Sequence, residues 1–170
     1  ELTTFRGRKE IPNVLDPQTY GGSQNINAGY FSLNHNISEK TKFQIGLRYE
    51  KIKQTISWST TLDPQGDTAV LNEDQWLPSM FILHKLNETN NIRLAASKTY
   101  TLPQYKEKAF FQFEEVTQVY LGNPALYSST SYNFDLKWEK FANAGELISI
   151  TAFTRLIEDP INDVSISSAS

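Results

Sequence analysis

Regular alternation between apolar and polar residues is the clearest pattern in this 170-residue chain. Within the segment Tyr132 to Phe141, apolar residues occupy every second position over the first eight residues, 132–139, and polar or charged residues lie between them. The segment from Lys42 to Gln54 repeats the pattern. Because successive side chains of a strand point to opposite faces, this alternation indicates β-strands with one apolar and one polar face. A helix would spread the same apolar residues around its circumference.

Four further segments show weaker versions of the pattern: Ile26 to Asn36, Trp76 to Leu86, Asn91 to Thr101 and Glu146 to Leu156. The middle of the segment that starts at Trp76 is apolar on both faces, which a buried strand of a soluble sheet would also be. Together with the two clear segments, they predict an all-β fold of about six strands.

The predicted connections alternate between short and long. Short polar turns lie at 38–41, 87–90 and 143–145, whereas long links lie at 57–74 and 102–131. Outer-membrane barrels place short turns on the periplasmic side and long loops outside, whereas soluble sandwiches mix the two. We therefore predict an antiparallel up-and-down meander, with three hairpins over 24–157. Residues 1–23 would form one external loop, and 158–170 would begin the next.

Strand length and aromatic residues agree with a membrane-spanning sheet. Tilted strands of about ten residues cross an apolar band of about 25 Å. Rings near predicted strand ends would suit the aromatic girdles at the membrane surfaces: Tyr30, Tyr49, Trp58, Trp76, Trp138 and Phe141. In a soluble β domain the same rings would be core residues. Single-chain barrels start at eight strands, so we expect these six to be an internal piece of a larger barrel.

Composition narrows the function classes. The chain has 16 basic and 19 acidic residues, a net charge of -3, and no basic stripe that would favour nucleic acid. It has no cysteine, which excludes disulfides and thiolate metal sites. No apolar run reaches the roughly 18 residues that a transmembrane helix needs.

Several short stretches match a known family in order and spacing. Residues 91–99 read NIRLAASKT, 122–126 read GNPAL, 131–139 read SYNFDLKWE and 145–153 read GELISITAF. Upstream, 28–33 read AGYFSL and 46–50 read GLRYE. Together these stretches resemble the C-terminal part of the β-barrel of TonB-dependent outer-membrane receptors, especially those of Bacteroidetes-type bacteria. The sequence departs from the family pattern at 127–129 and at Thr154.

This resemblance implies a barrel of about 22 strands in the bacterial outer membrane, closed by an N-terminal plug that this chain does not contain. It also implies energy-coupled uptake of a scarce solute, such as an iron chelate, a vitamin or a glycan. The partners would be outer-membrane lipid, the solute and the TonB complex, which the absent N-terminal part would contact. No cofactor is implied.

Two other function classes compete with transport. The first is a soluble β-sandwich that binds carbohydrate or protein through its loops. The second is a barrel enzyme, which is the weakest candidate because the sequence has no recognisable arrangement of nucleophile and base. We therefore expect a protein without catalytic activity.

Two groups of residues are candidates for function. The polar face of the predicted strands would line the barrel interior and carries seven charged residues: Arg48, Glu50, Arg93, Asp135, Lys137, Glu139 and Arg155. Ligand contacts would belong to the external loop around 100–118, whose aromatic residues are Tyr105, Phe110, Phe111 and Phe113. Rings on exposed loops can stack on ligands or pack against neighbouring loops, and both interpretations remain open.

Metal and acid–base sites are poorly supported. His35 and His84 are the only histidines and lack a third ligand in a fixed motif. The acidic stretches 63–67 and 73–74 lack the alternating oxygen pattern of a calcium loop. Glu114 and Glu115 are adjacent and would point to opposite faces of a strand.

The isolated segment would also expose a large apolar face and open strand edges. Unpaired edges and extended apolar surface favour pairing between chains. We therefore expect the excised segment to associate with copies of itself in the absence of lipid.

Overall fold

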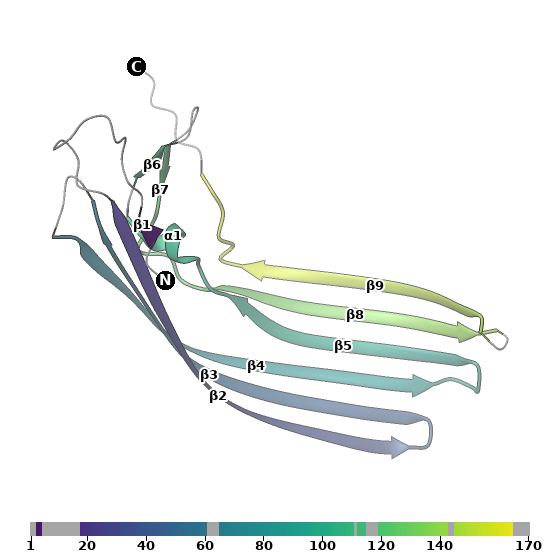
Figure 1. The fold of residues 1–170 in the computed structure, drawn as a ribbon. Helices are drawn as coiled ribbons and strands as arrows, with labels where there is room; N and C mark the ends of the chain where they lie inside the picture. The colour runs from purple at the N-terminus through teal and green to yellow at the C-terminus, as the bar shows by residue number, and fades with distance from the viewer. Residues whose placement is uncertain are drawn as a thin grey trace.

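The computed structural model describes residues 3–4, 18–60, 65–110, 112–114, 119–142 and 145–164. One curved antiparallel sheet dominates the structure, and its strands follow the order β1-β2-β3-β4-β5-β8-β9 (Figure 1). The strands of this sheet are β1 (Thr3–Thr4), β2 (Thr19–Ser38), β3 (Thr41–Ser59), β4 (Asp67–Lys85), β5 (Asn90–Thr101), β8 (Ser129–Phe141) and β9 (Leu147–Glu158). A short helix, α1 (Tyr105–Lys108), and a small hairpin of β6 (Gln112–Glu114) and β7 (Val119–Leu121) lie between β5 and β8.

The predicted meander of six strands is confirmed. From β2 to β5, each strand pairs with the next along the chain, and β8 and β9 continue the sheet beside β5. The described sheet does not close, as β9 forms one edge. A soluble sandwich needs two sheets packed face to face, and the only other described sheet is the hairpin β6–β7, whose two strands have three residues each. This open, curved sheet fits a part of a larger barrel.

Strand register separates the two faces of the sheet cleanly. One row across all six strands is apolar except at its last position: Leu33, Ile45, Met80, Ala96, Phe134 and Thr154. The neighbouring row points to the other face and holds small or polar residues: Ser32, Gly46, Ser79, Ser97, Asn133 and Arg155. We call the face with the first row the outer face and the face with the second row the inner face.

Three strands are longer than the sequence pattern predicted. β2, β3 and β4 have 20, 19 and 19 residues, so β3 and β4 extend into the predicted 57–74 link and β2 begins within the predicted loop 1–23. A strand of 19 residues is about 63 Å long at about 3.3 Å per residue. Even at a tilt of about 45° it would rise about 44 Å, well above an apolar band of about 25 Å. The ends of β2–β4 far from the short turns therefore extend beyond such an apolar band.

The upper limit of the apolar band lies at a pair of aromatic residues. Tyr49 and Trp76 face each other across β3 and β4 on the outer face, with ring centroids 4.7 Å apart. The Tyr49 hydroxyl donates to the Asp74 carboxylate at 2.9 Å. On the next outward-facing position of β3 lies Lys51, which is exposed. Rings with a polar tip suit the border between acyl chains and headgroups, as the sequence predicted for these two residues.

No helix among the described residues is long and apolar enough to cross a membrane.

Candidate functional site

The inner face carries two clusters of charged residues, one midway along β3 and the other near the short-turn ends of β5 and β8. Arg48 pairs with Glu50 at 2.5 Å, and Glu139 pairs with Arg93 at 2.8 Å and with Lys137 at 2.9 Å. The Tyr100 hydroxyl also donates to Glu50. Glu50 and Glu139 are only 6% and 3% exposed. Buried carboxylates need such partners, because desolvation makes an unpaired charge very costly.

The other two predicted inner-face charges lie on the same side of the sheet. Arg155 donates to Asn133 at 2.7 Å. Asp135 shares the alternation of Asn133 on β8 and is exposed. The seven charged residues predicted from the sequence therefore occupy one face, opposite the apolar band. A polar inner face of this kind is typical of outer-membrane barrels.

We call the stretch 102–128 the β5–β8 connection, and its described parts contact the inner face of the projecting strands (Figure 1). At its start, the Pro103 carbonyl accepts a hydrogen bond from Gln54 Nε2 at 3.0 Å. At its end, Ser128 N–H donates to Glu73 at 3.0 Å, and Gln75 Nε2 donates to the Ser128 hydroxyl at 3.0 Å. The connection is therefore tied to the sheet at both ends.

Between these ties, α1 packs closely on β2. A Cβ built on Gly22 would lie 2.7 Å from Cγ of the Tyr105 ring. A side chain at position 22 would therefore displace the ring. Glycine at this inward-facing position lets α1 approach the strand backbone.

A small apolar core lies under the connection. Ile56, Trp58 and Ala109 are buried together, and Tyr20, Ala69 and Tyr105 pack around them. The prediction that Trp58 belongs to an aromatic girdle is therefore wrong. Trp58 lies on the inner face, 9% exposed, in the part of β3 beyond the apolar band. Its ring is removed from water by the connection rather than by lipid.

The GNP stretch that resembles the receptor family serves to fold the connection. A Cβ on Gly122 would lie 2.0 Å from the Ala109 carbonyl oxygen, so only glycine fits this close approach. Asn123 N–H donates to the Glu107 carbonyl at 2.6 Å, and its side-chain oxygen accepts from Ala125 N–H at 3.0 Å. These contacts join α1 to the segment that returns to β8.

Lys108 is a buried cation within the connection. It is 2% exposed, and its Nζ donates to the Leu126 carbonyl at 2.5 Å. Burial lowers the pKa of Lys108 because the charged form loses its hydration, and the nearby Glu73 carboxylate offsets part of that effect. Glu73 therefore both anchors Ser128 and stabilises this charge.

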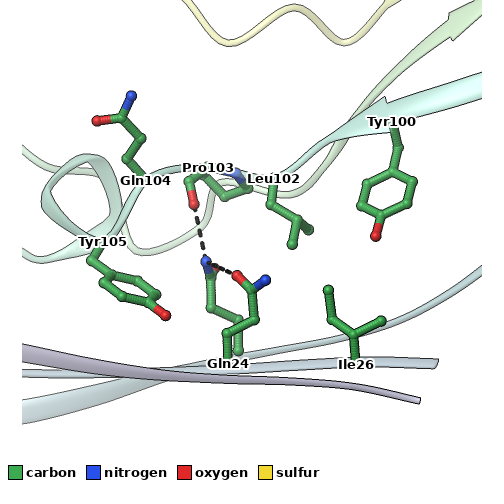
Figure 2. A pocket seen from close by; sticks show the side chains of 8 residues that line it. Gln24, Ile26, Tyr100, Leu102, Pro103, Gln104 and Tyr105 are labelled. Carbon is green, nitrogen blue, oxygen red and sulfur yellow. Dashed lines mark hydrogen bonds between the residues drawn. The ribbon is translucent and has the colours of Figure 1, made fainter. Parts of the chain in front are cut away.

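A cleft of about 510 Å³ lies between the connection and the inner face of β2 and β3 (Figure 2). Its floor is formed by Gln24, Ile26 and Gln54, and the start of the connection covers it. The residues that line it from above are Tyr100, Leu102, Pro103, Gln104 and Tyr105. Gln54 is 1% exposed, and its Oε1 is the one buried side-chain polar atom without a partner among the described residues.

Of the four aromatic residues predicted to contact ligand, the structure describes the side chains of two, Tyr105 and Phe110. Tyr105 lines the cleft, whereas Phe110 is 52% exposed, beyond the end of α1. Phe111 lies outside the described residues, and Phe113 is in β6, where its backbone pairs with Tyr120. Sequence reasoning missed Gln24 and Gln54. Gln54 already lies within the predicted segment 42–54, on its polar face, and extending the predicted segment 26–36 by two residues would have placed Gln24 on the inner face as well.

The described residues contain no group of three or more acidic or histidine side chains that would hold a metal ion. His84 Nδ1 is 2.9 Å from the Thr41 hydroxyl, and His35 lies on β2 opposite Phe43. Glu73 faces inward and Asp74 outward, so the two do not converge on one ion. Residues 63 and 64 of the calcium candidate and Glu115 of the carboxylate pair lie outside the described residues.

Removing the Glu73 carboxylate is expected to release the connection. Glu73→Ala deletes the acceptor for Ser128 and the anion near buried Lys108, which together should cost about 2–4 kcal/mol. Because the chain has no cysteine, Ala109→Cys in the buried core offers a specific reporter. Glu73→Ala should speed labelling of this thiol by maleimide at least tenfold. Asp74→Ala, which changes the neighbouring outer-face carboxylate, should not, and equal labelling in both variants would contradict the anchoring role.

A family model supports what the two faces of the sheet indicate. The model of the outer membrane protein beta-barrel family matches residues 4–170, nearly the whole chain. No curated protein matches the chain. The match agrees with the apolar outer face, the charged inner face and the open meander. The chain therefore belongs to the outer membrane protein β-barrel family and forms part of a barrel in the bacterial outer membrane, with lipid against its outer face.

Proposed function

We propose that the protein is a receptor that imports a scarce solute across the outer membrane with energy supplied through TonB. The observation that carries the proposal is the β5–β8 connection, which is docked on the inner face and borders an open, ligand-sized cleft. A passive pore works through an open, water-filled lumen. A structured segment on the inner wall suits selective binding instead, and the likeness of 91–153 to TonB-dependent receptors supports energy coupling.

The position of the docked connection supports a binding step before passage. It lies on the part of β2–β4 that projects beyond the apolar band, on the side opposite the short turns. Short turns face the periplasm in outer-membrane barrels, so this part faces the outside. A solute would reach the cleft before it reached the lumen. The proposal assigns binding and transport to the protein and no catalytic role.

Uptake measurements test this proposal. A strain that lacks the gene, and the same strain with the gene restored, are supplied with three radiolabelled probes: ferrichrome, cyanocobalamin and maltohexaose. We expect the restored strain to accumulate at least one probe, with saturation, and to lose that accumulation when a protonophore collapses the proton gradient. Accumulation that persists with the protonophore and rises linearly with probe concentration would indicate a passive pore and contradict the proposal.

A further inference from the structure

The side chains around the cleft are uncharged. Its eight lining residues are three glutamines, two tyrosines, one proline, one leucine and one isoleucine. A solute with carboxylate or phosphate groups would lose hydration here without meeting a compensating cation, and this loss is costly. The lining therefore favours a neutral solute.

Polar groups in the cleft leave hydrogen-bonding capacity open. Gln54 Nε2 donates to the Pro103 carbonyl at 3.0 Å and to Gln24 Oε1 at 3.4 Å. These two bonds fix the amide of Gln54, yet its Oε1 has no donor. A buried acceptor without a donor is unfavourable, so a hydroxyl or N–H group that entered the cleft would gain a bond at little cost.

Apolar surface lies next to these amides. Figure 2 shows Ile26 and Leu102 facing each other across the cleft, with Tyr100 at one end and Tyr105 at the other. Gln24 rises from the floor between the two rings, and Gln54, which donates to it, also lines the cleft. Pockets that bind small molecules combine apolar walls with a few polar groups that fix orientation, and a volume of about 510 Å³ is within their usual range.

We propose that this cleft is a subsite for a neutral, hydroxyl-rich solute, namely a small oligosaccharide. A sugar hydroxyl both donates and accepts hydrogen bonds. It can therefore donate to Gln54 Oε1 and accept from a neighbouring amide N–H. The C–H surface of a sugar ring can pack on Ile26, Leu102 and the tyrosine rings. This inference rests on the proposed import function and specifies the class of solute.

Calorimetric titration of the full-length protein in detergent tests the inference. The neutral probes are maltotriose, cellotriose and xylotriose, and trigalacturonate is the anionic probe of similar size. We expect at least one neutral probe to bind with a millimolar or lower Kd and trigalacturonate to bind at least tenfold more weakly. Failure of all three neutral probes to bind, or equal binding of trigalacturonate, would overturn the inference.

Substitutions then test whether Gln54 and Gln24 contribute to binding of the solute. Gln54→Leu and Gln24→Ala should each weaken binding about tenfold, the usual effect of one lost hydrogen bond. The matched control is Gln44→Leu, which changes the same residue type on the same strand and face outside the cleft and should leave the Kd unchanged. Gln24 is exposed, so Gln24→Ala keeps the test valid if Gln54→Leu fails to fold. An unchanged Kd in both variants would mean that water, and not the solute, donates the hydrogen bond to Gln54 Oε1. That result would overturn the inference.

These outcomes are separable from those of the import proposal. If a ferric or vitamin probe is accumulated in a protonophore-sensitive way but no trisaccharide binds, import stands and the sugar subsite fails. If a trisaccharide binds but its entry into cells ignores the protonophore, the subsite stands and energy-coupled import fails.

Discussion

Replacing Leu47 by arginine is expected to block assembly of the barrel in the outer membrane. Leu47 lies on the outer face of β3, opposite Phe31 on β2 and Pro78 on β4, two residues below the Tyr49–Trp76 pair. An arginine on the lipid face costs about 2–4 kcal/mol at the middle of the membrane and less toward the headgroups, so at Leu47, close below the upper limit of the apolar band, we expect a cost between these extremes. The outer-face residues paired with Leu47 on β2 and β4 are apolar or small, so no acidic partner is available there for the new charge.

The measurement is gel mobility of the full-length protein from outer membranes, with and without boiling. The native protein should shift on boiling, because a closed barrel resists detergent, and Leu47→Arg should lose most of the shifted fraction. Gln44→Arg places the same side chain on the inner face of the same strand, where the wall is polar, and should keep the shift. Normal assembly of Leu47→Arg would show that this face does not contact lipid.

Replacing Gly122 by alanine is expected to disrupt the packing of the β5–β8 connection. The new methyl group would lie 2.0 Å from the Ala109 carbonyl oxygen and 3.0 Å from that of Lys106, and both atoms belong to backbone that cannot rotate away. Overpacking of this kind typically costs about 1–3 kcal/mol. Part of the packing between α1 and the return segment would be lost, while the sheet, which pairs independently, should remain.

Limited proteolysis of the assembled protein measures this effect. Trypsin should cleave Gly122→Ala within the connection, at Lys106 or Lys108, at least tenfold faster than the native protein. Gly29→Ala is the matched control, because a Cβ at that position meets nothing within 4 Å. If the two variants resist trypsin equally, Gly122 is not required for the close approach to Ala109.

The extent of β3 shows what alternation alone could and could not predict. Up to Tyr49, the apolar residues of β3 face outward, and from Ile52 onward they face inward. When one apolar face is followed along the sequence, the alternation ends near Gln54, although the strand continues to Ser59. The change of face marks the point where β3 leaves the membrane. Below it lipid covers apolar side chains, and above it the connection does.

The candidate site was only partly predictable for a related reason. The seven inner-face charges follow from strand parity and could be read directly. The cleft, by contrast, depends on where residues 102–128 fold, and the ties at Pro103 and Ser128 join positions 49 and 53 residues apart in sequence. Short-range patterns carry no information about such pairs. The glycines at 22 and 122 mark these close approaches, but a glycine in sequence does not show which backbone or ring will lie against it.

Because the strands differ in length, a large agent outside the cell meets one side of the barrel rim before the other. β4 has 19 residues and β5 has 12, so one side of the rim extends further by about 23 Å along the strand, or about 16 Å in height at a tilt of about 45°. An antibody or a phage fibre, too large to enter, would touch the top of that high side first. Gln54 lies five residues, or about 16 Å, below the end of β3. Substitutions at the top can therefore alter recognition by such agents without touching the wall of the cleft, so the surface that such agents meet and the cleft can evolve separately.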